Sequence, residues 1–284
     1  MRFPAVMGRF YPASFDGLRS SVESCFAHPL GPGLPGPEGS ARRIRGAVVP
    51  HAGYMASGMN AAHAFRAIKE DGLPEAYVVI GPDHYGTADG TVLCSEEFAT
   101  PLGTCKVDVP ILEALMDVFE DDPSAHAMEH SIEVEVPFLQ YIDPDPKIVP
   151  IMMGRQTPQE AFRLASALKK ACEGRDVVVI ASTDLAHYVP KEVAARLDSM
   201  VESRVRSMDP DGLYSDVRSY RITMCGYGPV MAAMMFCEGC QARVLSHTDS
   251  FDSLGMDRES VVDYMSAVFE KKGRGGIPLG LRCV

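Results

Sequence analysis

Short, uninterrupted runs of apolar residues recur along the chain and predict buried strands. A strand with one solvent-facing side alternates apolar and polar residues, whereas these runs are apolar at nearly every position. Continuous runs of this kind are typical of parallel sheets that helices cover on both faces. The predicted buried strands are residues 46–49, 76–81, 148–152 and 176–182.

Between these runs, apolar residues are spaced three and four positions apart, which predicts helices. In the first helix, the spaced residues are Phe15, Leu18, Val22 and Phe26. Because strands and helices alternate, the chain is predicted to form one α/β domain over residues 1–284, with a central, mostly parallel or mixed sheet flanked by helices. The other predicted helices are residues 59–70, 109–119, 158–172, 191–208 and 230–237, with an amphipathic run within 126–141.

The remaining segments are shorter or carry no periodic pattern. Residues 91–94 and 105–107 are predicted to pair as short strands around a turn at 100–103, and residues 242–247 and 262–269 to form the last two strands. Two segments show no packing pattern and are predicted to be irregular: the flexible, Pro/Gly-rich loop 29–40 and the C-terminal tail 271–284.

Charge and cysteine content narrow the class of protein. The chain has 284 residues and a net charge of −11, which argues against nucleic acid or an anionic membrane as a partner. No apolar run approaches the roughly 18 residues of a membrane span, and the first ten residues lack the apolar core of a signal peptide. The eight cysteines are scattered rather than arranged as a disulfide framework. A cytoplasmic protein with reduced thiols is expected.

Polar residues follow three of the predicted buried strands at the point where each ends. His51 follows the first, His84 the second, and Asp184 with His187 the strand 176–182. Because parallel strands end at one edge of a sheet, these side chains are expected to converge there. Taken singly, a loop histidine is more often a surface or capping residue, and Asp184 has a turn-forming alternative. Candidate ligands from other loops are Glu129, His130 and Cys225, of which the cysteine could instead be a buried filler.

The residue types at this edge indicate a transition metal. Imidazole and thiolate ligands with a nearby carboxylate suit iron, copper or zinc rather than magnesium or calcium. Other motifs are weaker evidence for a functional site. Cys237 and Cys240 form a single CxxC without a second pair, which is at most half a zinc site. Glycines fit neither a P-loop nor a dinucleotide fingerprint, and no G-x-S-x-G elbow is present. A nucleotide enzyme or serine hydrolase is therefore not expected.

Five ordered motifs identify a resemblance to a known family. Together they resemble the MEMO family, which in microbes is also labelled AmmeMemoRadiSam system protein B. The resemblance runs from about residue 4 to residue 270. The motifs lie at residues 49–54 with 57–58, 81–84, 129–133 with 137–139, 182–188 and 223–226.

The resemblance implies a fold like that of class III extradiol dioxygenases, which hold a non-haem iron with two histidines and a carboxylate. The family's metal-site positions fall on His51, His84 and Cys225. Asp184, His187 and His130 match further pocket residues with catalytic roles. A cysteine stands where those dioxygenases have a glutamate, and a thiolate favours softer metals and can itself be oxidised. Ring cleavage therefore does not follow from the resemblance.

Two functions of different classes are expected from these residues. The first is a redox or dioxygenase-like activity, with iron(II) or copper, on an unknown substrate. The alternative is a non-catalytic module that binds a small molecule or peptide in the same pocket. Zinc-dependent hydrolysis is a third hypothesis, and it is favoured only if the protein retains zinc and oxygen plays no part. The family label also implies AMMECR1-like and radical-SAM partner proteins. Whether the protein is an enzyme, its substrate and its oligomeric state are left open by the sequence.

Overall fold

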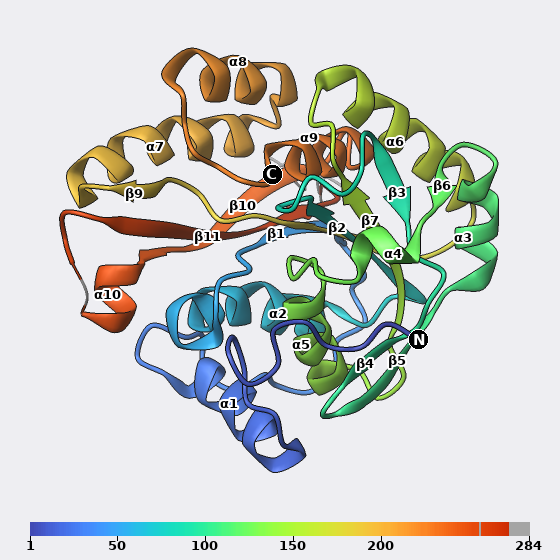
Figure 1. The fold of residues 1–284 in the computed structure, drawn as a ribbon, viewed down its shortest axis with the longest axis horizontal. Coiled ribbons are helices and arrows are strands. Elements are labelled where there is room, and N and C mark those ends of the chain that lie inside the picture. The colour runs from blue at the N-terminus through green and yellow to red at the C-terminus, as the bar shows by residue number, and fades with distance from the viewer. Residues whose placement is uncertain (256, 273–284) are drawn as a thin grey trace, which may run out of the picture.

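A mixed β-sheet runs through the middle of the molecule, with helices on both faces (Figure 1). The computed structural model describes residues 1–255 and 257–272. The tail predicted at 271–284 therefore lies almost entirely outside the described residues. In spatial order the main path of the sheet contains β10 (Gln241–Asp249), β11 (Val261–Glu270), β1 (Ile44–Val49), β8 (Val177–Ser182), β2 (Ala76–Pro82), β7 (Lys147–Met153), β3 (Thr91–Leu93) and β6 (Glu120–Asp121).

Four neighbouring strands, β1, β8, β2 and β7, are parallel. They are the four runs that the sequence predicts as buried strands. Apart from Arg45 in β1 and Lys147 at the start of β7, their residues are buried because helices cover both faces. Their carboxyl ends meet at one edge. β11 runs antiparallel to β1, and β10 antiparallel to β11, so the sheet is mixed.

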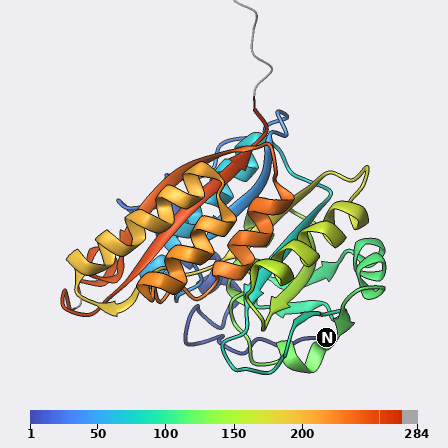
Figure 2. The ribbon, with the colours of Figure 1, turned by 90° about the horizontal axis from the view of Figure 1, so that it is seen from above.

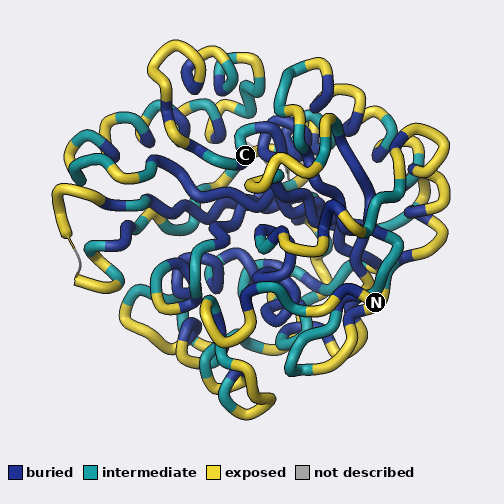
Figure 3. Tube along the Cα trace, viewed as in Figure 1, coloured by how far each residue is buried: buried dark blue, intermediate teal, exposed yellow. Residues whose placement is uncertain are grey.

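The helices form two layers. Figure 2 views one layer from above, and Figure 3 shows the buried band of the sheet between the layers. Hydrophobic residues of each layer form a separate core against one face of the sheet. The first layer contains α3 (Val109–Met116), α6 (Pro158–Ala171), α7 (Lys191–Ser207), α8 (Pro210–Tyr220) and α9 (Tyr227–Phe236); the second contains α1 (Phe15–Ala27), α2 (Met59–Asp71) and α5 (Val136–Ile142).

Several segments differ from the sequence prediction, and three of them are described below. The turn at 100–103 joins β4 (Phe98–Thr100) to β5 (Gly103–Val107), so the pairing of 91–94 with 105–107 was wrong. β3 pairs with β7 and β6 instead. The run 126–141 is divided into α4 (Pro123–His126), a loop, a 3-10 turn (Glu133–Glu135) and α5. Helix α8 was not predicted, although Asp209 caps it and Pro210 opens it, both common helix-start signals.

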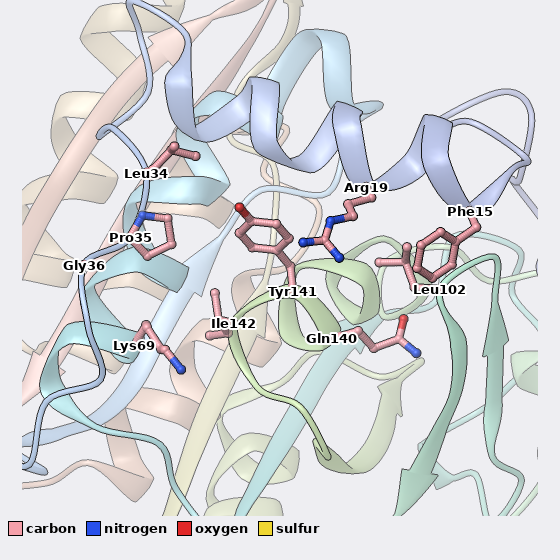
Figure 4. A pocket seen from close by; sticks show the side chains of 10 residues that line it. All are labelled: Phe15, Arg19, Leu34, Pro35, Gly36, Lys69, Leu102, Gln140, Tyr141 and Ile142. Atoms are coloured by element: carbon pink, nitrogen blue, oxygen red, sulfur yellow. The ribbon is translucent and has the colours of Figure 1, made fainter.

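The Pro/Gly segment 29–40 forms neither helix nor strand, as predicted, and it lies against α2. Gly36 and Gly39 donate backbone hydrogen bonds to Glu70 and Lys69, at 2.9 and 3.1 Å. Together with α1 and α5 it borders a pocket of about 470 Å3, lined by side chains that include Phe15, Leu34 and Tyr141 (Figure 4). None of the predicted site residues lines this pocket.

The N-terminal arm is fastened to the domain by a buried ion pair. The guanidinium of Arg2 pairs with the carboxylate of Glu133, and both side chains are only 1% exposed. Glu133 also accepts hydrogen bonds from the backbone of Ala5 (2.7 Å) and from the hydroxyl of Tyr11 (2.6 Å). One carboxylate thus organises the first eleven residues. None of the described helices is both long enough and apolar enough to span a bilayer.

Candidate metal centre

Three predicted metal ligands meet at the carboxyl edge of the parallel strands. His51 follows β1, His84 follows β2, and Cys225 precedes α9. One nitrogen or sulfur atom from each lies within 4.8 Å of the others. The Nε2 atom of His51 is 3.2 Å from the Sγ atom of Cys225, and the rings of His51 and His84 stand perpendicular, with centroids 5.1 Å apart. His51 and His84 are positions that strand-end reasoning predicts to converge, and Cys225 is the position that the family resemblance adds.

His51 is buried and its ring is oriented by a chain of hydrogen bonds. Its Nδ1 atom lies 2.7 Å from the hydroxyl of Ser182, which donates to the carbonyl of Ser131 at 2.6 Å. Because the serine hydroxyl donates its only proton to Ser131, it can only accept a hydrogen bond from His51. The Nδ1 atom of His51 therefore carries the ring proton, and Nε2 directs a lone pair towards Cys225. Burial, with the neighbouring His84 and His130, lowers the pKa of His51, which keeps the ring neutral and able to bind a metal.

Glu135 contacts Ser182 and so helps to orient the ring of His51. Its Oε1 atom is 3.0 Å from the hydroxyl of Ser182, and the side chain is fully buried. Burial raises the pKa of Glu135 well above its ordinary value, although the serine opposes the shift. A protonated Glu135 can donate to Ser182, which completes the hydrogen-bonding of a group that would otherwise be an uncompensated buried charge.

His84 is oriented by a carboxylate. Its Nδ1 atom is 2.9 Å from Oε1 of Glu129, and its backbone N–H donates to Oε2 of the same residue at 2.8 Å. Burial alone would raise the pKa of Glu129, but its hydrogen bonds with His84 outweigh burial and hold the pKa far below the usual range. Burial would lower the pKa of His84, yet Glu129 raises it overall. A histidine whose Nδ1–H meets a carboxylate presents Nε2 as a ligand, a common arrangement in metal sites.

The loop before α9 positions Cys225. The side chain of Gln156 donates to the carbonyl of Cys225 at 2.8 Å and accepts from the N–H of Gly228 at 2.7 Å. The backbone N–H of Asp184 points at the sulfur, 3.2 Å away. A Cβ atom on Gly226 would lie 2.3 Å from the carbonyl oxygen of Ser182, so only glycine allows this close approach. Burial, followed by the charge of Asp184, raises the pKa of the thiol.

Asp184 is buried and contacts both His51 and Cys225. Its Oδ1 atom accepts a 2.8 Å hydrogen bond from the backbone N–H of His51. Burial raises the pKa of Asp184 to about 6, partly opposed by His187, so the carboxyl group can gain or lose a proton near neutral pH. His187 is not among the three converging ligands. Its Nδ1 atom is 2.7 Å from the carbonyl of Leu185, and Thr223 holds its backbone N–H at 2.7 Å.

His130 is stacked against the ligand pair. Its ring lies 4.6 Å from that of His84 at 25°, and 5.5 Å from that of His51. Its Nδ1 atom is buried without a hydrogen-bond partner in the described chain, and the nearest carboxylate oxygen, on Glu129, is 3.5 Å away. Burial lowers the pKa of His130 to about 4, so this ring is neutral at pH 7. Because Nδ1 lies beside the Glu129 carboxylate, the proton of the neutral ring is favoured on Nδ1, which leaves Nε2 as the acceptor for a ligand in the pocket.

The centre is open on one side. His51 is buried and Cys225 half-buried, while the side chain of His84 is 27% exposed. Phe10 touches the ring of His130, with centroids 4.9 Å apart, and lines a groove of about 620 Å3 with exposed Met55. A buried ligand set with one accessible face is the form that catalytic metal sites take.

The sequence predicts the three residues that converge here, but not the residues that orient them. Glu135 and Gln156 carry no motif that marks them, and Ser182 enters the prediction only as part of the motif at 182–188. Cys237 and Cys240 lie at the far end of α9 and take no part in the centre. There the neighbouring Cys237 thiol lowers the pKa of Cys240 to about 7.

Comparisons with known proteins place the chain among relatives of similar length. The family model described as "Memo-like protein" matches residues 2–268. A MEMO1 family protein of Methanothermobacter thermautotrophicus is 41% identical over 273 residues, covering 93% of this chain and 98% of the relative. A MEMO1 family protein of Ignicoccus hospitalis is 42% identical over 282 residues, covering 95% and 98%.

A solved structure gives a more distant likeness. An uncharacterized protein of Escherichia coli has a TM-score of 0.53 at 14% sequence identity, with 78% of this chain and 99% of that chain covered. At this identity, the likeness concerns the α/β fold alone. The family match extends over nearly the whole sequence and includes every residue of the candidate centre. The chain therefore belongs to the Memo-like protein family.

Proposed function

We propose that the protein binds one iron(II) or copper ion through His51, His84 and Cys225 and uses it in a redox reaction on a small molecule. The observation that carries the proposal is the convergence of two imidazoles and one thiol within 4.8 Å. The histidine tautomers support it, because Ser182 and Glu129 occupy the Nδ1 atoms and leave both Nε2 atoms free. This donor set suits a soft or borderline metal.

Three further side chains have positions suited to proton transfer and ligand binding. When bound, the metal ion would supply redox chemistry and Lewis acidity that side chains lack. Asp184 holds a carboxyl group whose pKa of about 6 allows it to give or take a proton beside the ligands. His130, with its Nδ1 atom beside Glu129, offers Nε2 as an acceptor to a substrate. His187, whose charge acts on Asp184, is the third proposed catalytic residue.

The first test is the metal content of wild-type protein purified without oxygen and without chelators. We expect about one equivalent of iron or copper per chain, followed by consumption of oxygen with catechols or related reductants. Retained zinc without oxygen consumption would favour the hydrolytic alternative. Protein that remains folded and metal-free after incubation with each ion would contradict the proposal.

Metal affinity is expected to rise with pH in two regimes. Binding displaces the thiol proton of Cys225, because burial raises its pKa, so log K should increase by about one per pH unit near neutrality. Below the raised pKa of His84, a second proton competes for its imidazole, and the slope should approach about two. Competition with a chromogenic chelator between pH 5 and about pH 8 measures both slopes. A pH-independent affinity would exclude these two groups as ligands.

Glu129→Gln is expected to weaken metal binding by about 10–100-fold. The amide retains the size of the side chain and can still accept the Nδ1–H of His84, but it removes the charge that favours ligation. The same substitution should lower the pKa of His84 and move the change of slope to lower pH. Glu113→Gln, at an exposed position of α3, is the matched control. Equal affinity in Glu129→Gln and wild type would contradict this role.

A binding module is the second candidate function, supported by a groove of about 620 Å3 that includes Phe10, the residue in contact with His130. The three candidate metal ligands do not line this groove. Its apolar lining, with exposed Met55, suits a peptide or an apolar small molecule. The proposed protein partners are the AMMECR1-like and radical-SAM proteins that the family label implies. A pull-down of either partner by metal-free protein, lost in Met55→Asp, would favour this function; capture that requires metal would not.

A further inference from the structure

A second cluster of potential metal ligands lies between α7 and the last two strands. It consists of Asp198 on α7, His247 on β10 and Asp263 on β11, with one ligand atom of each within 4.8 Å of the others. Register explains the convergence: His247 pairs with Met265, and Asp263, two positions earlier, points to the same face of the sheet. The cluster shares no residue with the candidate metal centre.

The histidine of this cluster is already oriented for ligation. Its Nδ1 atom lies 3.3 Å from Oε2 of Glu202, which is one helical turn from Asp198 on the same face of α7. Its Nε2 atom faces Oδ2 of Asp263 at 3.5 Å. That separation is long for a hydrogen bond. Two ligand atoms each about 2.0–2.2 Å from a tetrahedral ion would lie about 3.3–3.6 Å apart.

One carboxylate oxygen in the cluster lacks a partner. Asp263 is 3% exposed, and its Oδ1 atom accepts no hydrogen bond in the described part of the chain. The neighbouring Asp198 is fully buried, so two carboxyl groups share a site from which water is largely excluded. A buried, unpartnered carboxylate is costly and calls for a cation or a proton.

We propose that Asp198, His247 and Asp263 bind a zinc ion, with Glu202 orienting the imidazole. One imidazole and two carboxylates match zinc better than copper(I), which prefers sulfur, or magnesium, which prefers oxygen and water. The side chain of His247 is 27% exposed, which gives the ion a path from solvent. The inference does not depend on metal binding at the first centre.

The rival explanation is that protons alone neutralise the cluster. Burial, followed by Asp263, raises the pKa of Asp198 to about 9, and the neighbouring carboxylates of Asp263 and Glu202 raise the pKa of His247 despite burial. A neutral Asp198 could then donate to Asp263. This arrangement satisfies one carboxylate oxygen by proton sharing and needs no metal.

An ion here would also stiffen the loop that carries Asp184 and His187. The carboxylate of Asp198 accepts from the backbone N–H of Ala186 at 3.2 Å. The backbone of Asp263 exchanges hydrogen bonds with Leu185 (2.8 Å) and Ala186 (3.0 Å). The cluster thus contacts the backbone of the same loop that carries Asp184 and His187 at the first centre.

Zinc titration of the full chain tests the proposal in a background that lacks the first centre. In the variant His51→Ala with His84→Ala, which removes a ligand from both groups of potential ligands at the first centre, calorimetry should show one zinc equivalent, and zinc should raise the melting temperature. Adding Asp263→Asn, which keeps the shape of the side chain and removes carboxylate repulsion, should abolish both effects. Adding Glu202→Gln should weaken binding by about 10–100-fold.

Controls separate this cluster from adventitious zinc. Cys240→Ala and His28→Ala in the same background should retain the equivalent, because neither side chain belongs to the cluster. If Asp263→Asn fails to fold, His247→Gln, at the solvent-facing edge, makes the same comparison. No zinc equivalent in the background variant, or one that persists in Asp263→Asn, would overturn the proposal and leave a carboxyl pair that shares a proton.

Discussion

His51→Ala and Cys225→Ala are each expected to reduce metal binding at the proposed iron or copper site by more than about a hundredfold. Each removes one of three converging ligands, whereas loss of an orienting group alone costs about 10–100-fold. Elemental analysis after anaerobic purification, followed by chelator competition, measures the loss. Cys225→Ser keeps the size of the side chain and distinguishes the loss of the thiolate from a packing defect.

Two matched substitutions control for general effects of removing a histidine or a cysteine. His28→Ala lies at an exposed position after α1, and Cys240→Ala lies beyond the far end of α9. Both should bind metal as wild type does. Full metal content in His51→Ala would reject the proposed ligand set, and an equal loss in Cys240→Ala would shift attention to the CxxC pair.

Glu133→Gln is expected to lower the free energy of unfolding by about 3–5 kcal/mol. The substitution leaves the guanidinium of Arg2 buried without a counter-charge, since both side chains of the pair are 1% exposed. It also replaces one acceptor oxygen with an amide nitrogen where Ala5, Val6 and Tyr11 all donate. Urea unfolding followed by circular dichroism measures the change.

A surface ion pair of the same arm provides the comparison. The amino group of Met1 lies 3.0 Å from Glu96, but these groups are 44% and 39% exposed. Glu96→Gln should therefore change the free energy of unfolding by less than about 1 kcal/mol. Similar losses in both variants would show that burial of the Arg2–Glu133 pair does not set its contribution.

The loop 184–187 lies between the two proposed metal sites. Asp184 contacts His51 and Cys225 of the first site, while its neighbours Leu185 and Ala186 are held by residues of the second. Metal added to wild-type protein can therefore change the same loop from either side. Variants that remove one cluster at a time separate the two contributions, so the Asp263→Asn chain is also a useful background for studying the first centre.

Local sequence patterns determined the core of the fold and the positions of two of the three candidate ligands. Four continuous apolar runs became the parallel strands β1, β2, β7 and β8. Parallel strands end at one edge, so residues that follow them meet without any knowledge of packing. For this reason His51 and His84 could be paired from sequence, and the family resemblance added Cys225. Helix α8 was not predicted, because only three of its residues are buried and its apolar pattern is therefore short.

Only the tertiary structure decided which groups surround those ligands. The serine and glutamate that orient His51 lie 131 and 84 positions further along the chain, at Ser182 and Glu135. Gln156 reaches Cys225 across 69 positions, and Arg2 reaches Glu133 across 131. The cluster of Asp198, His247 and Asp263 depends on strand register and on where α7 packs. Periodicity records which face of an element is buried, but not which side chain of a distant element will lie opposite it. The convergence of the three candidate ligands could therefore be predicted from sequence and resemblance, while their tautomers, their pKa values and the second cluster could not.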